Sequence, residues 1–143
     1  MKKVIVRLGN GLGNQLFTYA AAYAFSKKNN AELLIDNESG FYKRYKYELN
    51  HFNISAAIAS EKNKFKGFYG KTKRKILLSL SKINLNKKFL VETKNKKKLT
   101  FYNPEQFNIS FEDYLFFEGY FQSEKYFDDY KKDIENENKF KDN

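Results

Sequence analysis

Three glycines at alternating positions, Gly9, Gly11 and Gly13, form the stretch of the sequence best suited to chemistry. Glycine lets the backbone adopt positive φ and lets a ligand come close to the main chain. The largely apolar residues 16–25 that follow predict a helix, whose first turn presents unpaired N–H groups and the positive end of the helix dipole. These features together bind anions, and phosphate is the usual one. The sequence therefore predicts an anion site in the glycine turn at 9–15.

Two strands and a helix must position this turn. Residues 4–8 are β-branched and apolar, as in a buried parallel strand. The helix is predicted to run from about Asn14, as its N-cap, to Lys28. A second strand over 32–35 ends in Asp36. Because a strand–helix–strand unit joins parallel strands with a right-handed crossover, we expect an α/β fold with a parallel, Rossmann-like sheet.

The rest of the chain reads as one lobe. We expect a polar loop over 37–47, a short strand or extended segment over 47–54, a short helix over 56–64, a break over 67–70 and a helix over 71–83. These are followed by a strand over 89–92, an exposed turn over 94–98, an irregular segment over 99–109, a strand over 114–121 and a helix from 124. The strand over 114–121 is apolar nearly throughout, which favours an interior position, and Gly119 predicts a bend. Ser123 is a natural N-cap for the last helix. We expect one domain over 1–134 and a frayed polar tail over 135–143.

The helix predicted over 71–83 allows two interpretations. Ile76, Leu80 and Ile83 share one face, and the residues just before Ile76 are mostly basic. A basic beginning with an apolar middle suits an anionic membrane surface. The same apolar face also suits packing on the sheet, and we prefer that interpretation. The expected location is therefore the cytoplasm, with peripheral contact at the inner face of the membrane as the alternative.

The composition narrows the function classes. The formal net charge of +10 comes mainly from lysine, as in proteins of AT-rich genomes. No nucleic-acid-binding module with interleaved Arg and aromatic residues is visible, so we expect no nucleic-acid partner. The absence of cysteine excludes disulfides and thiolate metal sites, and no ordered set of His, Asp or Glu suggests a metal. No apolar run approaches the ~20 residues of a membrane span, and the first residues do not form a signal peptide.

Two common nucleotide motifs fit the glycine turn poorly. A P-loop requires Lys followed by Ser or Thr after its last glycine, and neither pair follows here. The dinucleotide fingerprint G-x-G-x-x-G can start at Gly9 and Gly11, but its third glycine falls on Asn14. Asp36 stands where a ribose-binding acid would stand, although a turn residue at the end of a strand is the preferred interpretation.

A third comparison fits better. The stretch from Asn10 to Ala20 resembles the G-G-L-G-N-Q-[ML]-F-x-Y-A opening of the bacterial α-1,2-fucosyltransferases, glycosyltransferase family 11. Residues 47–54, Tyr-Glu-Leu-Asn-His-Phe-Asn-Ile, resemble the family's F-E-L-x-x-F-N-I segment. Residues 117–127 resemble its x-x-G-Y-[FW]-Q-S-x-K-Y-F segment. The three blocks occur in the family's order.

The resemblance implies a reaction and a set of site residues. The family transfers L-fucose from GDP-L-fucose to the 2-hydroxyl of a galactoside, with inversion and without a metal or other cofactor. The implied contacts to the phosphates or fucose of the donor are Gly11, Leu12, Gly13, Asn14 and Gln15. The alternative for Asn14 is a cap alone, and for Gln15 a solvated residue of the first turn. The candidate acceptor-side residues are Glu118, Gln122 and Ser123, and the alternative for Glu118 is an exposed residue at a strand end.

The sequence departs from the family in two ways. Asn10 replaces the first glycine, a mild change because Asn tolerates left-handed backbone. The H-x-R-x-G-D motif of the second lobe does not occur in the 143 residues, so the resemblance implies the N-terminal half of a GT-B-like enzyme with negligible activity alone. The single histidine, His51, is expected to be a half-buried structural residue rather than a base. The alternatives are a non-catalytic nucleotide- or sugar-binding α/β module and a basic protein that binds membranes or nucleic acid.

Overall fold

The computed structural model describes residues 1–83 and 87–142. In this part of the chain, five strands form one parallel sheet in the order β3-β2-β1-β5-β4. The strands are β1 (Lys3–Arg7), β2 (Glu32–Asp36), β3 (Ala57–Ile58), β4 (Phe89–Val91) and β5 (Tyr114–Glu118), and the helices are α1 (Leu12–Lys28), α2 (Gly67–Ile83) and α3 (Lys131–Glu137). The expected α/β, Rossmann-like lobe with a parallel sheet is confirmed.

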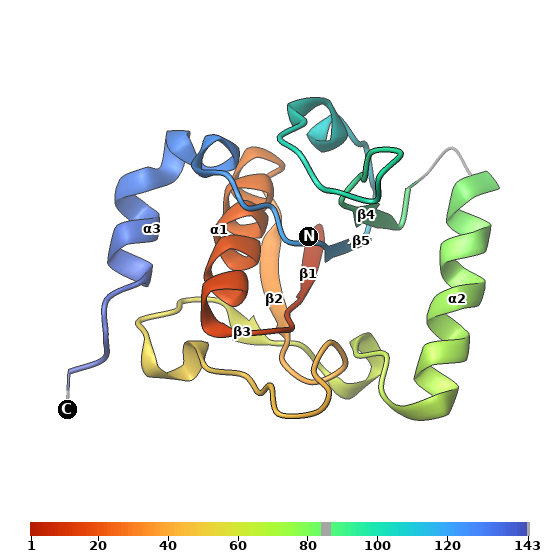
Figure 1. Cartoon of the computed structure of the whole chain (residues 1–143), viewed down its shortest axis with the longest axis horizontal. Coiled ribbons are helices and arrows are strands. Elements are labelled where there is room, and N and C mark those ends of the chain that lie inside the picture. Colours follow the sequence, from red (N-terminus) through yellow and green to blue (C-terminus); the bar gives the residue numbers. More distant parts are fainter. Residues whose placement is uncertain (84–86, 143) are drawn as a thin grey trace.

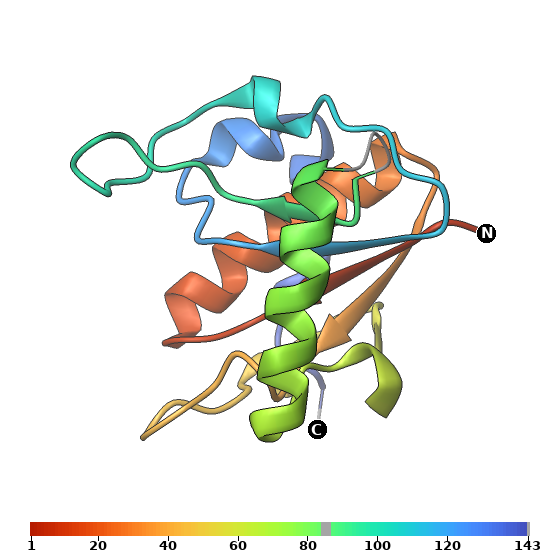
Figure 2. The ribbon, with the colours of Figure 1, turned by 90° about the vertical axis from the view of Figure 1, so that its right-hand side faces the viewer.

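Helices cover the two faces of the sheet unequally (Figure 1). Helix α1, with α3 beside it, packs on one face and builds the larger core, which includes Val4, Val6 and Leu8 of the β1 segment. The smaller core on the other face is centred on Ile5, Leu34 and Ala59. Helix α2 stands on this second side and is the element nearest the viewer in Figure 2.

Helix α1 is buried over most of its length because residues 18–26 are small or apolar. The helix begins at Leu12, and its N-cap is Gly11 in extended conformation. The predicted N-cap at Asn14 is therefore wrong. The earlier start places Asn14 inside the first helical turn, where its side chain does not cap the helix.

Three predictions between β2 and α2 are wrong. The segment over 47–54, expected to be extended, contains a 3₁₀ turn over Leu49–His51. The helix expected over 56–64 is replaced by β3 and a 3₁₀ turn over Glu61–Asn63, because Ala57 and Ile58 pair with β2. The break expected over 67–70 is the first turn of α2. A Cβ on Gly70 would lie 2.4 Å from the carbonyl carbon of Phe65. Gly70 is thus required by close packing of the backbone rather than by a turn.

Strand β5 lies inside the sheet between β1 and β4, as predicted, but ends at Glu118. Gly119 confirms the predicted bend, since its φ is +145° and an added Cβ would lie 2.4 Å from Cβ of Glu92. The carboxylate of Glu92 accepts hydrogen bonds from the N–H groups of Tyr120 and Phe121, at 2.9 and 3.0 Å. The chain therefore turns away from the sheet three residues before the predicted end of the strand.

The last helix is shorter than predicted. Ser123 caps a 3₁₀ turn over Glu124–Tyr126, a second 3₁₀ turn covers Asp128–Tyr130, and only then does α3 begin. The tail expected to fray from residue 135 continues α3 to Glu137, and the ring of Phe140 stacks on Phe52 with centroids 4.7 Å apart. The domain boundary at 134 stays a prediction. None of the described helices is long and apolar enough to cross a bilayer.

Candidate functional site

A cavity of about 270 Å³ opens at the carboxyl ends of β1, β4 and β5. Its walls come from the turn after β1, the loop after β2, and the segments that follow β4 and β5. Helix α1 carries the chain from β1 to β2 on one side, while β5 lies on the other side of β1. Open parallel sheets bind ligands in the crevice at such a change of direction. The cavity therefore occupies the place where this fold usually holds a ligand.

Two glycines bring the loops after β1 and β2 together. A Cβ on Gly9 would lie 2.6 Å from the carbonyl oxygen of Gly40, and one on Gly40 would lie 2.1 Å from that of Leu8. Asn10 adopts a left-handed conformation with φ of 61°, in agreement with the tolerance expected of Asn. Among the described residues, no side chain caps the start of α1, so the first N–H groups of the helix have no side-chain capping partner there.

The residues predicted to contact the donor, Gly11 to Gln15, do not line the cavity, whereas Gly9 and Asn10 do. Gly13 is exposed at the start of α1, and an added Cβ there would meet nothing within 4 Å. The structure thus places the start of the turn in the cavity wall and the first turn of α1 outside it. Donor contacts by Gly11, Leu12, Gly13 and Asn14 stay predictions.

Gln15 is fully buried, so its interpretation as a solvated residue is wrong. Its amide group donates to the carbonyl oxygens of Asn10 and Lys46 and accepts from the N–H of Glu48, each at 3.0 Å. These three bonds fasten the segment 46–48 to the glycine turn. Because these bonds occupy its amide group, the Gln15 side chain stabilises the glycine turn from within the protein.

Asn14 and Gln122, predicted on opposite sides of the site, are in contact. Nε2 of Gln122 donates to Oδ1 of Asn14 at 2.5 Å. The contact brings the first turn of α1 to the segment that follows β5. Ser123 is next in the chain, but its hydroxyl accepts from the N–H of Lys125, and it does not line the cavity.

Thr18 belongs to the cavity wall, although sequence reasoning missed it. Its Oγ1 lies 2.8 Å from the carbonyl oxygens of both Asn14 and Gly119. The buried hydroxyl therefore joins α1 to the bend after β5. Its position as a polar residue between Phe17 and Tyr19, in an otherwise apolar run, could have indicated a role in the site.

Glu118 lies in the cavity wall but is buried, so its interpretation as an exposed residue is wrong. Both carboxylate oxygens accept from Arg74 of α2: Nε lies 2.8 Å from Oε1, and NH2 contacts Oε2. The hydrogen bonds to Glu118 raise the pKa of Arg74, against the opposing effect of burial. Glu118 is thus a fixed anion rather than a free base. Arg74 was missed because nothing in the sequence links it to Glu118.

Arg7 supplies a cation to the cavity, and sequence reasoning missed it as well. Its Nε donates to Oγ of Ser39 at 3.0 Å and its NH2 to the Ser39 carbonyl at 2.8 Å. Among the described residues, no carboxylate forms an ion pair with it. The half-buried guanidinium is therefore oriented by neutral partners and keeps its charge for an anionic ligand.

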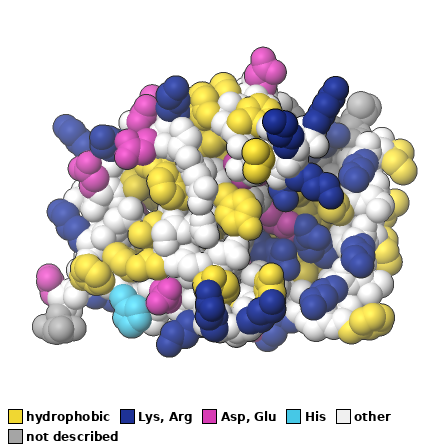
Figure 3. Space-filling view, viewed as in Figure 1, with side chains coloured by type: hydrophobic (Ala, Val, Ile, Leu, Met, Phe, Trp, Pro, Cys, Tyr) yellow, Lys and Arg dark blue, Asp and Glu magenta, His cyan; other side chains and the backbone are white. Residues whose placement is uncertain are grey.

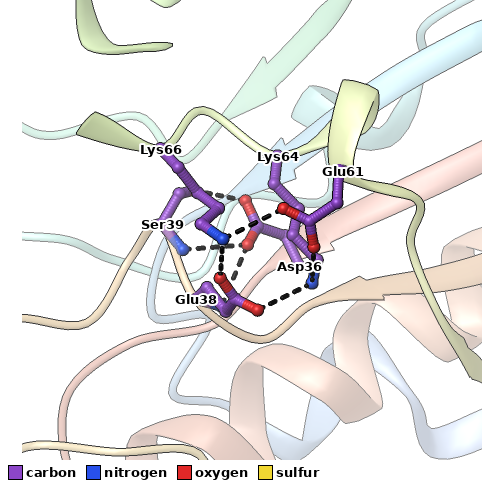
Figure 4. A network of polar contacts seen from close by, with 6 residues as sticks. All are labelled: Asp36, Glu38, Ser39, Glu61, Lys64 and Lys66. Carbon is purple, nitrogen blue, oxygen red and sulfur yellow. Dashed lines mark hydrogen bonds and ion pairs between the residues drawn. The ribbon is translucent and has the colours of Figure 1, made fainter. Parts of the chain in front are cut away.

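Asp36 holds Ser39 in place (Figure 4). Its Oδ1 accepts from the N–H groups of Glu38 and Ser39, at 3.0 and 2.9 Å, and its Oδ2 contacts the Ser39 hydroxyl. This arrangement confirms the interpretation of Asp36 as a turn residue at the strand end. Its role in the site is indirect, because it fixes the partner of Arg7.

Two lysines attach the same loop to the segment before α2 (Figure 4). Lys64 Nζ lies 3.1 Å from Glu38 Oε1 and 3.3 Å from Glu61 Oε1, and Lys66 bridges the same two carboxylates. Hydrogen bonds from Lys66, and then from Lys64, lower the pKa of both Glu38 and Glu61. The cluster lies mostly at the surface, so we assign it to positioning of the loop rather than to chemistry.

The remaining sequence candidate lies elsewhere. His51 is exposed at the end of a 3₁₀ turn over Leu49–His51, so the expectation of a half-buried histidine is wrong. It does not line the cavity. Within residues 1–83 and 87–142, no group of three or more His, Asp or Glu side chains could hold a metal ion.

Two curated proteins of Escherichia coli are similar to the chain. An α-1,2-colitosyltransferase is 32% identical over 139 residues, which cover 94% of this chain and 44% of that protein. The O-antigen biosynthesis glycosyltransferase WbnK is 43% identical over 53 residues, or 33% of this chain and 18% of that protein. The matches support a glycosyltransferase. No family model and no solved structure matches, and the chain spans less than half the length of either relative.

Proposed function

We propose that the chain forms the N-terminal lobe of a galactoside α-1,2-fucosyltransferase that uses GDP-L-fucose and is located in the cytoplasm. The observation that carries the proposal is the cavity at the carboxyl ends of the strands, where Arg7 lies beside the glycine turn. The similarity to a colitosyltransferase over 94% of the chain supports the reaction class. The three sequence blocks support fucose as the sugar and a galactoside as the acceptor.

The proposed reaction is a single inverting displacement. The bond between the anomeric carbon of fucose and the diphosphate oxygen breaks, and its electron pair leaves with GDP. The oxygen of the acceptor 2-hydroxyl forms the new bond to that carbon and gives up its proton to a base, which we do not assign. Arg7 and the N–H groups of the glycine turn stabilise the negative charge that develops on the diphosphate. No metal is needed in this scheme.

The other predicted residues take positioning roles. Gln15 holds the glycine turn, which presents the N–H groups. Asp36 holds the loop with Ser39, which orients the guanidinium of Arg7. Asn14 is held by Gln122, which orients it for the donor. On the acceptor side, Glu118 lies in the cavity wall as an anion fixed by Arg74, while Gln122 and Ser123 lie outside that wall and position the segment after β5.

Titration of the ¹⁵N-labelled chain with GDP-fucose, followed by NMR, tests the donor site. We expect shifts of the amides of Gly9 to Asn14 and of Nε of Arg7 with GDP and GDP-fucose, but not with guanosine, because the phosphates carry the contact. Arg7→Gln should weaken GDP binding by roughly 10- to 100-fold, the effect of one charge-assisted hydrogen bond. Arg44→Gln is the matched control, since Arg44 is exposed and outside the cavity. Equal effects of the two variants would contradict the site.

Transfer itself is tested with lactose as the acceptor and with GDP-fucose and GDP-colitose as donors, whose sugars differ by one hydroxyl group. We expect negligible turnover by the 143-residue chain, because Arg7 and the exposed Lys94 are the only cations among the described residues that line the cavity. We also expect GDP-fucose to bind more tightly than GDP-colitose. Tighter binding of GDP-colitose would overturn the assignment of fucose and leave glycosyl transfer intact.

A further inference from the structure

Helix α2 carries an exposed apolar strip, which consists of Phe68, Tyr69, Ile76, Leu80 and Ile83. These side chains are 88%, 82%, 56%, 53% and 83% exposed, respectively. At 3.6 residues per turn, they fall within about 120° of the helix circumference. The preferred interpretation from the sequence, that this face packs on the sheet, is therefore wrong.

The opposite side of α2 attaches the helix to the lobe. Gly70 and Ser81 are buried there, and Oγ of Ser81 accepts from the N–H of Lys88 at 3.2 Å. Arg74, from the same side, contacts Glu118. These small and polar residues, together with the half-buried Leu77 and Leu78, make the attachment, and the apolar strip faces outward. In Figure 2 no other element lies in front of α2.

Lysines border the strip on both sides. By helical position, Lys71, Lys75 and Lys82 lie along one edge and Lys73 along the other, and α2 contains no acidic residue. Figure 3 shows Lys and Arg gathered over the half of the molecule with α2 and β4, while Asp and Glu lie mostly toward α3. Lysine can extend its charged group past an apolar surface while its stem stays in contact with that surface.

We propose that α2 lies flat in the headgroup region of an anionic lipid bilayer, with the apolar strip among the upper acyl chains and the lysines on lipid phosphates. The proposal does not depend on the catalytic assignment. The apolar strip matches the acyl chains of such a bilayer, and the lysines on either side of it match the lipid phosphates. A nucleic acid offers phosphates but no apolar layer for the strip. A second copy of the chain would bring lysine rows against lysine rows.

The absence of tryptophan from the chain permits a direct test of insertion. Phe68→Trp places a single tryptophan in the strip, and Leu99→Trp places one at a 59% exposed position outside α2. With vesicles of phosphatidylcholine and phosphatidylglycerol, we expect emission of Phe68→Trp to shift to shorter wavelength and to be quenched by brominated acyl chains. Phosphatidylcholine alone should produce neither change. An equal response of Leu99→Trp, or no response of Phe68→Trp, would overturn the proposal.

Vesicle sedimentation tests the two parts of the surface separately. Lys71→Glu/Lys73→Glu/Lys75→Glu should weaken binding to the anionic vesicles at least about tenfold, whereas the same change at Lys96, Lys97 and Lys98 in the exposed turn should have little effect. Ile76→Glu/Leu80→Glu should also release the protein, with Leu99→Glu/Phe101→Glu as its control. Circular dichroism verifies that each variant is folded. Equal binding to neutral vesicles, or a dimer that Ile76→Glu/Leu80→Glu dissociates, would contradict the lipid surface.

Discussion

The guanidinium of Arg74, in the middle of α2, donates two hydrogen bonds to the carboxylate of Glu118 at the end of β5. The pair joins the helix with the exposed apolar strip to a wall of the cavity. It also explains why the strip faces outward, since Arg74 lies on the side of α2 opposite to the strip. This ion pair thus contributes to the orientation of α2 and holds the cavity carboxylate in place.

Arg74→Met should destabilise the fold by about 1–3 kcal/mol, because it leaves the buried carboxylate of Glu118 without its partner. Urea denaturation followed by circular dichroism measures the change. Arg44→Met, at an exposed position, should stay within about 0.5 kcal/mol of the parent chain. Equal unfolding midpoints for the two variants would show that the ion pair adds nothing to stability.

Gln15→Ala should cost about 2–4 kcal/mol of stability, since it removes three hydrogen bonds and leaves the carbonyls of Asn10 and Lys46 and the N–H of Glu48 without partners. Asn14→Ala is the control, because it removes one contact with an exposed side chain. If Gln15→Ala unfolds at the urea concentration of Asn14→Ala, the buried amide is not what holds the turn.

Glycine-to-alanine changes should have opposite signs at two positions of the site. In Gly40→Ala the new Cβ would lie 2.1 Å from the carbonyl oxygen of Leu8, so the loops must separate and stability and nucleotide binding should both fall. Gly13→Ala meets nothing within 4 Å in a helix and should stabilise the fold by roughly 0.5–1 kcal/mol. Thermal unfolding of the two variants measures the difference, and a stable Gly40→Ala would contradict the close approach of the loops.

Stability should fall at alkaline pH. Burial, followed by the hydrogen bond to Glu137, raises the pKa of Tyr19 above its ordinary value of 10.0, and burial also raises the pKa of Tyr23, Tyr47 and Tyr126. Because the unfolded chain loses these protons first, stability is complete below pH 10.0 and decreases above it, by about 1.4 kcal/mol per pH unit for Tyr19, whose pKa is raised the most. Tyr19→Phe should reduce the slope. Urea unfolding between pH 8 and 11 provides the measurement, and an unchanged slope would contradict the burial of this hydroxyl.

The elements around the glycine turn could be predicted from the sequence, because their signals are local. The β-branched run before Gly9 and the apolar run after Gln15 specify β1 and α1 without knowledge of the rest of the chain. Glu118 was also found, since it ends an apolar strand. The short strand β3 was missed because pairing with β2 overrides the weak preference of its own residues.

The partners of the site residues could not be predicted in this way. Arg7 acquires its role from Ser39, and Glu118 from Arg74, across 32 and 44 positions of the chain, respectively. For α2, periodicity identifies an apolar face but not the side that the lobe holds. The contacts of Gly70, Arg74 and Ser81 help to determine that side, and these three residues have no apolar signature.

The position of β1 in the sheet has a consequence for biosynthesis. Lys3 of β1 pairs with Glu32 on one side but with Tyr114 on the other, so a ribosome must complete most of the chain before the second partner exists. At about 5–20 residues per second, the open edge of β1 waits on the order of 5–20 s. During that interval one edge of β1 has unpaired backbone groups, and such an open strand edge promotes association between unfinished chains.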